Sequence, residues 1–122
     1  MIKVLLIEDN EDNRLSMTIL LESGGFKVIE AETGRLGLEA AITEKPDVIL
    51  LDIQLPDIDG TEVLKRLLES ESTRDIPVIA VTSYAMSGDR QRLLAAGCKE
   101  YIEKPFDPMR VVDQVRAIIG GS

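Results

Sequence analysis

Short apolar runs alternate along the chain with longer segments in which apolar residues recur every three or four positions. The runs are rich in Val and Ile and too short for helices, so each of them predicts a strand. The predicted strands cover residues 4–7, 28–31, 48–51, 78–81 and 101–102. The central runs are almost continuously apolar, as expected for strands that are covered on both faces of a sheet.

The segments between these runs have the residue spacing of amphipathic helices. Their apolar positions are Met17, Leu20 and Leu21; Leu38, Ala41 and Ile42; Leu64, Leu67 and Leu68; Leu93, Leu94 and Ala96; and Val112, Val115 and Ile119. Glycines follow the first, fourth and fifth segments and a proline follows the second, which is typical of helix ends. Five strands that alternate with five helices predict an α/β fold with a parallel sheet covered on both faces.

Composition narrows the class of protein. A chain of 122 residues suits one domain, so we expect a single domain over residues 1–122. Hydrophobic residues make up 44% of the chain and aromatic residues only 3%, which predicts an aliphatic core. No apolar run approaches the ~18 residues of a membrane-spanning helix, and the acidic start is unlike a signal peptide. We therefore expect a cytoplasmic protein without a membrane partner.

Net charge and the rare residue types argue against several kinds of chemistry. The formal net charge of −8 opposes binding to phosphate backbones, so we expect no nucleic-acid partner. A single cysteine excludes an internal disulfide. The absence of histidine argues against a zinc site and against a histidine-based catalytic triad.

Polar side chains follow four of the five predicted strands directly. They are Glu8, Asp9 and Asn10 after the first, Asp52 after the third, Thr82 and Ser83 after the fourth, and Lys104 and Pro105 at the end of the fifth. In open α/β sheets, functional groups gather beyond the carboxyl ends of the strands. The parallel sheet therefore predicts one site that contains three carboxylates, a hydroxyl and an ammonium group.

These side chains suit a metal ion and a phosphoryl group. Three clustered carboxylates repel one another, and a divalent cation would compensate their charge. Oxygen ligands without His or Cys favour Mg²⁺, or Mn²⁺ as a similar ion. Lys104 could contact one phosphoryl oxygen, and the hydroxyl of Thr82 could donate a hydrogen bond to another. The set predicts phosphoryl transfer in which Asp52 is the nucleophile and forms an aspartyl-phosphate.

Each of these residues also has a purely structural interpretation. Asp52 could end its strand as a turn residue, and Glu8 and Asp9 could cap the first helix. Thr82 could close a strand, and Lys104 could be an ordinary surface lysine. The catalytic interpretation rests on the order of these residues and on their shared place at strand ends.

The chain resembles the receiver domain of two-component response regulators over about residues 3–119. Four motifs carry the resemblance: the acidic Glu8–Asn10, the D-I-Q-L-P-x-x-x-G loop at Asp52–Gly60, A-V-T at Ala80–Thr82, and Y-I-x-K-P at Tyr101–Pro105. The chain is most similar to single-domain, DivK-like receivers and to the receivers of hybrid histidine kinases. The resemblance implies a flavodoxin-like (βα)5 fold with a five-stranded parallel sheet in the order 2-1-3-4-5.

The resemblance also implies a role for each matching residue. Asp52 would accept a phosphoryl group from a histidine kinase or a histidine phosphotransferase. Asp9 would bind Mg²⁺ directly, and Glu8 would bind it directly or through water. Asp52 and the backbone carbonyl of Gln54 would complete the protein ligands of the metal. Lys104 would contact the phosphoryl group.

Signal output would depend on two further residues. Thr82 and Tyr101 would form a switch pair, and the peptide bond between Lys104 and Pro105 would be cis. A downstream protein would bind the face formed by helix four, strand five and helix five. Candidate residues of that face are Tyr84, Met86, Met109 and Val112.

The leading hypothesis is a phosphoacceptor module of a two-component phosphorelay that has no output domain of its own. It is not an enzyme in the usual sense, although it would catalyse its own phosphorylation and dephosphorylation. One alternative is an aspartate-nucleophile phosphatase, which would need a second Asp where Gln54 stands. Another is a nucleotide binder, which would need glycines in the acidic loop at residues 8–13. The last is a receiver-like binding module that works without phosphorylation.

Overall fold

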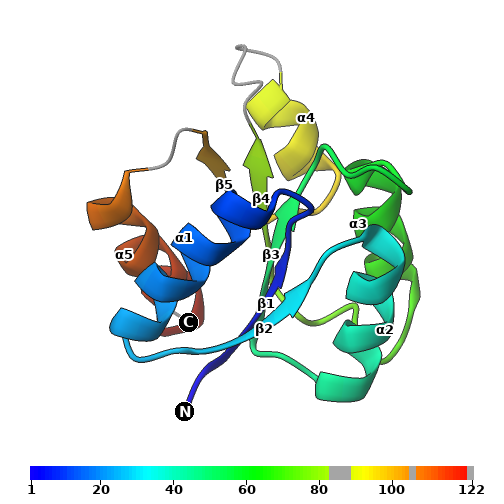
Figure 1. Ribbon diagram of the computed structural model, residues 1–122. Coiled ribbons are helices and arrows are strands. Elements are labelled where there is room, and N and C mark those ends of the chain that lie inside the picture. The colour runs from blue at the N-terminus through cyan, green and yellow to red at the C-terminus, as the bar shows by residue number, and fades with distance from the viewer. Residues whose placement is uncertain (83–88, 105–106, 121–122) are drawn as a thin grey trace.

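The computed structural model describes residues 1–82, 89–104 and 107–120 (Figure 1). Its elements are β1 (Lys3–Ile7), α1 (Glu11–Ser23), β2 (Lys27–Ala31), α2 (Gly34–Glu44), β3 (Val48–Asp52), α3 (Gly60–Glu69), β4 (Val78–Thr82), α4 (Asp89–Ala95), β5 (Glu100–Glu103) and α5 (Pro108–Gly120). The predicted strands and helices are all present. Each strand extends one or two residues beyond the apolar run that predicted it.

Four residues named in predictions lie outside the described residues, among them Ser83, which follows the fourth predicted strand. The cis peptide bond was predicted at Pro105, and Tyr84 and Met86 were predicted to contribute to a partner-binding face. These predictions are therefore not tested by the structure.

The strands form one parallel sheet in the order β2-β1-β3-β4-β5, which confirms the predicted flavodoxin-like α/β fold. The central strand β3 pairs with β1 on one side and with β4 on the other. In this register Leu51 lies beside Ile7 of β1, and Asp52 lies beside Val81 of β4. Asp52 therefore stands in the middle of the carboxyl edge of the sheet.

Two apolar layers hold the sheet between its helices. Alternate residues along a strand point to opposite faces, so Leu51 packs in the layer under α2, α3 and α4, whereas Leu50 packs in the layer under α1 and α5. Figure 1 shows α1 and α5 on one side of the sheet, with α2 and α3 on the other. All five residues of β3 are buried, which confirms the expected burial of this strand on both faces.

Local side-chain caps fix where three of the helices begin. Asn10 accepts a hydrogen bond from the backbone N–H of Asn13 at the start of α1, and Asp59 caps α3 through the N–H of Thr61. Thr33 does the same for α2. Such caps satisfy backbone donors that have no partner within the helix. Among the described residues, no helix is long and apolar enough to cross a membrane.

Ile42 is one of the apolar positions that predicted α2, but its side chain is 49% exposed. The buried positions of α2 are Gly34, Gly37 and Ala41. A Cβ atom added at Gly37 would collide with the side chain of Ile7. The helix thus packs against β1 through small residues, with Leu38 partly buried against the core and the larger Leu36 and Ile42 exposed.

Gly60 shapes the loop that follows Asp52. Its backbone N–H donates to the carbonyl of Ile53 at 2.9 Å, which closes the loop between β3 and α3. A Cβ atom added at Gly60 would collide with the Cα of Ile53 and would lie 2.8 Å from the carbonyl oxygens of Asp52 and Ile53. Because these are backbone atoms, only movement of the loop could relieve the collision.

We therefore expect Gly60→Ala to destabilise the fold by roughly 1–3 kcal/mol, the usual cost of overpacking. Urea denaturation followed by circular dichroism measures the free energy of unfolding. Lys65→Ala, an exposed change on the same helix, is the control and should stay within about 0.5 kcal/mol of wild type. Equal stability of the two variants would show that the loop can absorb the extra atom.

Candidate functional site

The carboxyl edge of the sheet brings three acidic side chains together. Glu8 follows β1, Asp9 is its neighbour, and Asp52 ends β3. One carboxylate oxygen from each residue lies within 4.8 Å of the others. Glu8 and Asp52 are only 4% and 2% exposed, whereas Asp9 is exposed. The predicted acidic cluster is therefore present, with two members buried and one in contact with solvent.

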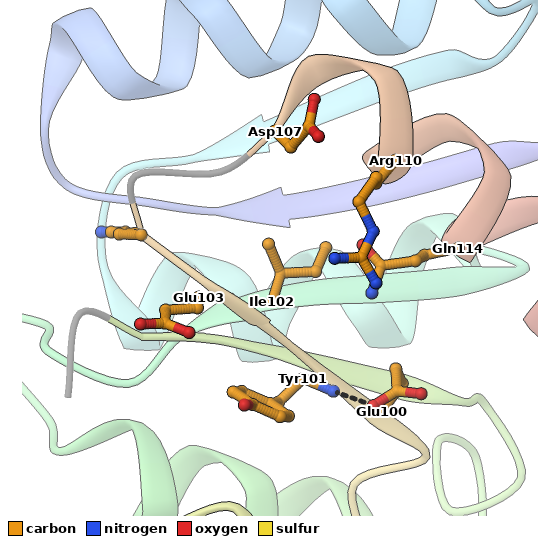
Figure 2. Close-up of a pocket in the computed structure, with 8 residues that line it drawn as sticks. Glu100, Tyr101, Ile102, Glu103, Asp107, Arg110 and Gln114 are labelled. Atoms are coloured by element: carbon orange, nitrogen blue, oxygen red, sulfur yellow. Dashed lines mark hydrogen bonds between the residues drawn. The ribbon is translucent and has the colours of Figure 1, made fainter. Parts of the chain in front are cut away.

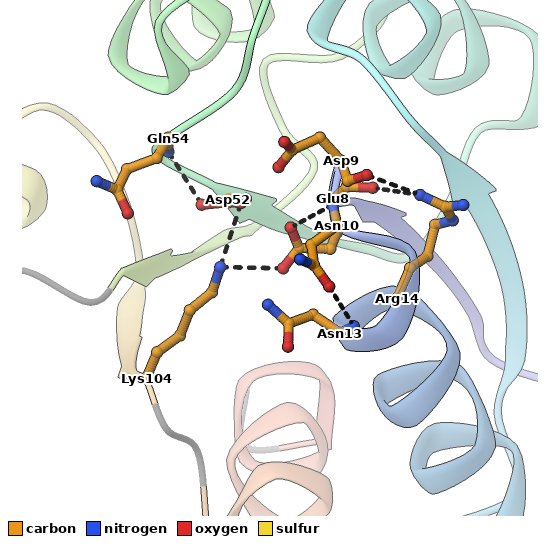
Figure 3. A network of polar contacts seen from close by, with 8 residues as sticks. All are labelled: Glu8, Asp9, Asn10, Asn13, Arg14, Asp52, Gln54 and Lys104. Atoms are coloured by element: carbon orange, nitrogen blue, oxygen red, sulfur yellow. Dashed lines mark hydrogen bonds and ion pairs between the residues drawn. The ribbon is translucent and has the colours of Figure 1, made fainter.

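Lys104 extends from the end of β5 into this cluster (Figure 3). Its Nζ lies 3.0 Å from Oε1 of Glu8 and 3.2 Å from Oδ2 of Asp52. The ion pair with Asp52 fits the site predicted from the strand ends. The ion pair with Glu8 was not predicted, because sequence analysis assigned Lys104 only to a phosphoryl group.

The surroundings shift the pKa values of two of these groups. Burial raises the pKa of Glu8, and the adjacent Asp52 raises it further. Burial alone would lower the pKa of Lys104, but its contacts with Glu8 and Asp52 outweigh this effect and raise it. The ammonium group is therefore the cation that compensates the buried carboxylates when no metal is bound.

The loop after β3 is held at several points. The backbone N–H of Gln54 donates to Oδ1 of Asp52 at 2.9 Å, which fixes the orientation of the carboxylate. Asp57 accepts hydrogen bonds from the N–H groups of Gly34 and Arg35, at 2.8 Å and 3.1 Å. Burial would raise the pKa of Asp57, but these donors lower it. Asp57 therefore ties the loop to the start of α2, a role that sequence analysis did not predict.

Sequence analysis also did not predict that Arg14 contacts the turn that carries Glu8 and Asp9. From the first turn of α1 its Nη1 reaches back to the carbonyl oxygens of Glu8, at 2.9 Å, and Asp9, at 3.3 Å. Nothing in the sequence distinguishes this arginine from an ordinary surface residue of the helix. It follows Glu8 and Asp9 by only six and five residues, which is compatible with the contact.

Thr82 and Tyr101 lie on the face of the sheet that is covered by α2, α3 and α4. Thr82 ends β4 and is 3% exposed, and Tyr101 is half-buried on β5. Tyr101 is the register partner of Ala80 and packs against the apolar layer under α2, α3 and α4. Strand alternation puts Thr82 on the same face as Ala80. The predicted switch residues thus share one face, whereas Asp52 is on the opposite one with Leu50.

The donor set fits a hard divalent cation. All three side-chain ligands are carboxylates, and the described residues of the cluster include neither sulfur nor nitrogen ligands. Mg²⁺ is commonly bound by one or two carboxylates and water, so the exposed Asp9 leaves an accessible side for hydrated metal. The cluster therefore suits a hydrated magnesium ion.

Comparisons with known proteins agree with this geometry. The response regulator receiver domain family matches residues 4–116. The chain is 42% identical over 117 residues to the polar-differentiation response regulator DivK of Brucella ovis. The aligned residues cover 96% of this chain and 95% of that protein.

Solved structures give the same result for the fold. A chemotaxis protein of Vibrio cholerae is similar with a TM-score of 0.90 at 26% identity, over 97% of this chain and 98% of that one. The receiver domain of a sensor histidine kinase from Pseudomonas aeruginosa has a TM-score of 0.88 at 32% identity, with 98% of each chain covered. That structure contains a magnesium ion coordinated in its active-site cleft.

Replacing Lys104 with methionine tests the electrostatics of the cluster. Lys104→Met leaves two buried carboxylates without their cation, which should lower the free energy of unfolding by roughly 3 kcal/mol in metal-free buffer at pH 7. Urea denaturation measures the loss, and Lys99→Met, at an exposed position, should change stability by less than about 0.5 kcal/mol. Adding Glu8→Gln to Lys104→Met should recover part of the stability. Equal effects of Lys104→Met and Lys99→Met would contradict this account.

Proposed function

We propose that Asp52 accepts the phosphoryl group in this chain. The chain belongs to the response regulator receiver domain family and is a phosphoacceptor of two-component signalling. The observation that supports the assignment of Asp52 is the position of its carboxylate. Asp52 ends the central strand, accepts a hydrogen bond from Gln54 and contacts Lys104, with Glu8 and Asp9 close by. The module is a signalling protein rather than a true enzyme.

The proposed reaction transfers a phosphoryl group from a phosphohistidine to Asp52. A bond forms between a carboxylate oxygen and phosphorus while the bond between phosphorus and the donor nitrogen breaks. The Gln54 N–H holds one carboxylate oxygen, so the nucleophile keeps one orientation. Lys104 is placed to contact the oxygens of the transferred group, where charge accumulates.

Glu8, Asp9 and Asp52, with the backbone carbonyl of Gln54, would hold Mg²⁺ or Mn²⁺ in this proposal. The bound ion would neutralise negative charge on the phosphoryl oxygens and the carboxylates. Lys104 already contacts both Glu8 and Asp52 in the structure. A metal held by Glu8 would compete with one contact of Lys104, and the ammonium would then be available to the phosphoryl group.

The partners follow from the family. A histidine kinase or a histidine phosphotransferase would supply the phosphoryl group, and a downstream protein would bind the face of α4, β5 and α5. Figure 2 shows the part of this face where β5 and α5 line a pocket, with Tyr101, Glu103 and Arg110 among its residues. Met109 at the start of α5 is 81% exposed, as an apolar contact residue would be.

We place the module in the cytoplasm, where the thiol of Cys98 stays reduced.

An aspartate-nucleophile phosphatase is less well supported. Such an enzyme would need a general acid two residues after the nucleophile, and Gln54 has no acidic group. The ionic contact of Lys104 with the buried Glu8 and Asp52 also argues against a binding module that works without phosphorylation.

The assignment of Asp52 can be tested by chemical phosphorylation. Incubation with acetyl phosphate and Mg²⁺ should add one phosphoryl group, located by mass spectrometry on Asp52 and released by hydroxylamine. Asp52→Asn should abolish the labelling. Asp59→Asn, an exposed aspartate in the same loop, should retain it. Phosphoryl label that persists in Asp52→Asn would assign the acceptor role to another residue.

The switch can be tested by following Tyr101 directly. In this proposal Thr82 turns toward a phosphoryl group on Asp52, and its movement leaves space that Tyr101 can fill. Beryllium fluoride, a phosphoryl mimic, should therefore shift the equilibrium of Tyr101 between outward and inward positions by roughly 5-fold or more. Fluorine NMR of 3-fluorotyrosine in a Tyr84→Phe background measures this shift.

Thr82→Ala should bind the mimic but leave the Tyr101 resonance near its starting position. Thr61→Ala, a control in α3, should respond as wild type does. An equal change of the Tyr101 resonance in Thr82→Ala and wild type would contradict coupling through Thr82, while the assignment of Asp52 would still stand.

A further inference from the structure

The turn between β1 and α1 carries two of the three acidic side chains, and Arg14 holds the backbone of this turn. Nη1 of Arg14 donates to the carbonyl oxygens of Glu8 at 2.9 Å and Asp9 at 3.3 Å. Only 13% of the arginine side chain is exposed. Figure 3 shows Arg14 on the side of the turn away from Asp52 and Lys104. It therefore acts on the site through backbone and makes no direct contact with the reacting group.

Two acidic residues near the end of β2 hold the rest of the guanidinium. Nε of Arg14 lies 4.0 Å from Oε2 of Glu30, and Nη2 lies 3.7 Å from Oε1 of Glu32. Glu30 is held in turn by the hydroxyl of Thr18, which donates to Oε2 at 2.8 Å. A planar guanidinium has donors in fixed directions, so these contacts set the direction in which Nη1 reaches the turn.

Further hydrogen bonds fix the two ends of the same turn. The N–H of Glu8 donates to the carbonyl of Ala31 at 3.0 Å and so continues the pairing of β1 with β2. At the other end, the N–H of Asn10 donates to Oε2 of Glu8 at 3.2 Å. Arg14 contacts the two carbonyl groups between these points. Without it, the peptide planes that orient the side chains of Glu8 and Asp9 would lose their shared donor.

We propose that Arg14 is a positioning residue for metal binding: it fixes the carbonyl groups of Glu8 and Asp9 so that their carboxylates stay directed toward Asp52. The inference rests on the metal site of the proposed function. In this role Arg14 favours metal binding through the geometry of its hydrogen bonds, whereas its positive charge opposes metal binding. As a cation near the site, Arg14 by itself repels Mg²⁺, although Glu30 and Glu32 partly neutralise it.

The opposite signs of these two effects make the proposal testable. Loss of a positive charge strengthens cation binding by simple electrostatics. Loss of the support that orients metal ligands weakens it, typically by 10- to 100-fold. A purely structural role of Arg14 would change the free energy of unfolding and leave the Mg²⁺ affinity of the folded protein unchanged.

The experiment is isothermal titration with Mg²⁺ of wild type, Arg14→Ala and Arg14→Lys, alongside urea denaturation of each. We expect Arg14→Ala to raise the Kd for Mg²⁺ by about 10-fold or more. Arg14→Lys should give an intermediate Kd, because an ammonium group can donate to a carbonyl but cannot contact both glutamates at once. Arg116→Ala is the matched control, since Arg116 donates to the carbonyl of Gly24 at the far end of α1. Its Kd should equal that of wild type.

A Kd for Arg14→Ala that equals the wild-type value, or is lower, would overturn the proposal. If Arg14→Ala does not fold, Arg14→Lys serves as the test. A wild-type Kd for Mg²⁺ in Arg14→Lys would then overturn the proposal. Wild-type protein that fails to bind Mg²⁺ would instead overturn the metal site of the proposed function, and this inference with it. The two failures are therefore distinguishable.

Discussion

The contact of Lys104 with two buried carboxylates is the interaction on which the site depends. Glu8 and Asp52 are almost completely removed from solvent, and two anions in such surroundings are stable only if a cation is close. Lys104 lies 3.0 Å and 3.2 Å from them. The sheet can therefore bury an aspartate, the proposed phosphoacceptor, at the end of its central strand, because Lys104 partly compensates the buried negative charge.

The same arrangement explains how the site can respond to ligands. In the proposed function, a metal ion and a phosphoryl group would each change the charge around Lys104, and the ammonium group would follow the negative charge to the phosphoryl oxygens. Thr82 and Tyr101, on the other face of the sheet, transmit the change toward α4 and β5 in the proposed switch. In this proposal the buried strands keep their positions, and the side chains at their ends respond.

Most of the fold could be predicted from the sequence, because short Val- and Ile-rich runs and amphipathic segments alternate with little ambiguity. The same alternation predicted the convergence of Glu8, Asp9, Asp52 and Lys104, since the carboxyl ends of parallel strands share one edge. The apolar spacing that predicted α2 includes Ile42, which is exposed, because such spacing does not show how closely a helix approaches its sheet. Gly37 lets α2 approach β1 closely, and this depends on contacts between distant residues.

The supporting contacts of the site could not be predicted for a related reason. Asp57 caps α2 from a loop 23 residues away in sequence, and Arg14 is held by Glu30 of β2 and by Glu32, which follows that strand. The ion pair between Lys104 and Glu8 joins the first and last strands of the fold. A residue type and a local spacing give no indication of such partners, because each partnership arises only when the sheet has formed.

The central claim is that Glu8, Asp9 and Asp52 form one metal site beside Lys104, and paramagnetic broadening by Mn²⁺ tests it most directly. Amide resonances in ¹H–¹⁵N NMR spectra lose intensity in proportion to their closeness to bound Mn²⁺. The account predicts that substoichiometric Mn²⁺ broadens the amides of Glu8, Asp9, Asp52 and Gln54 first, that Mg²⁺ reverses the effect, and that Asp9→Asn weakens it. Broadening spread over other acidic residues of the surface, unchanged in Asp9→Asn, would contradict it.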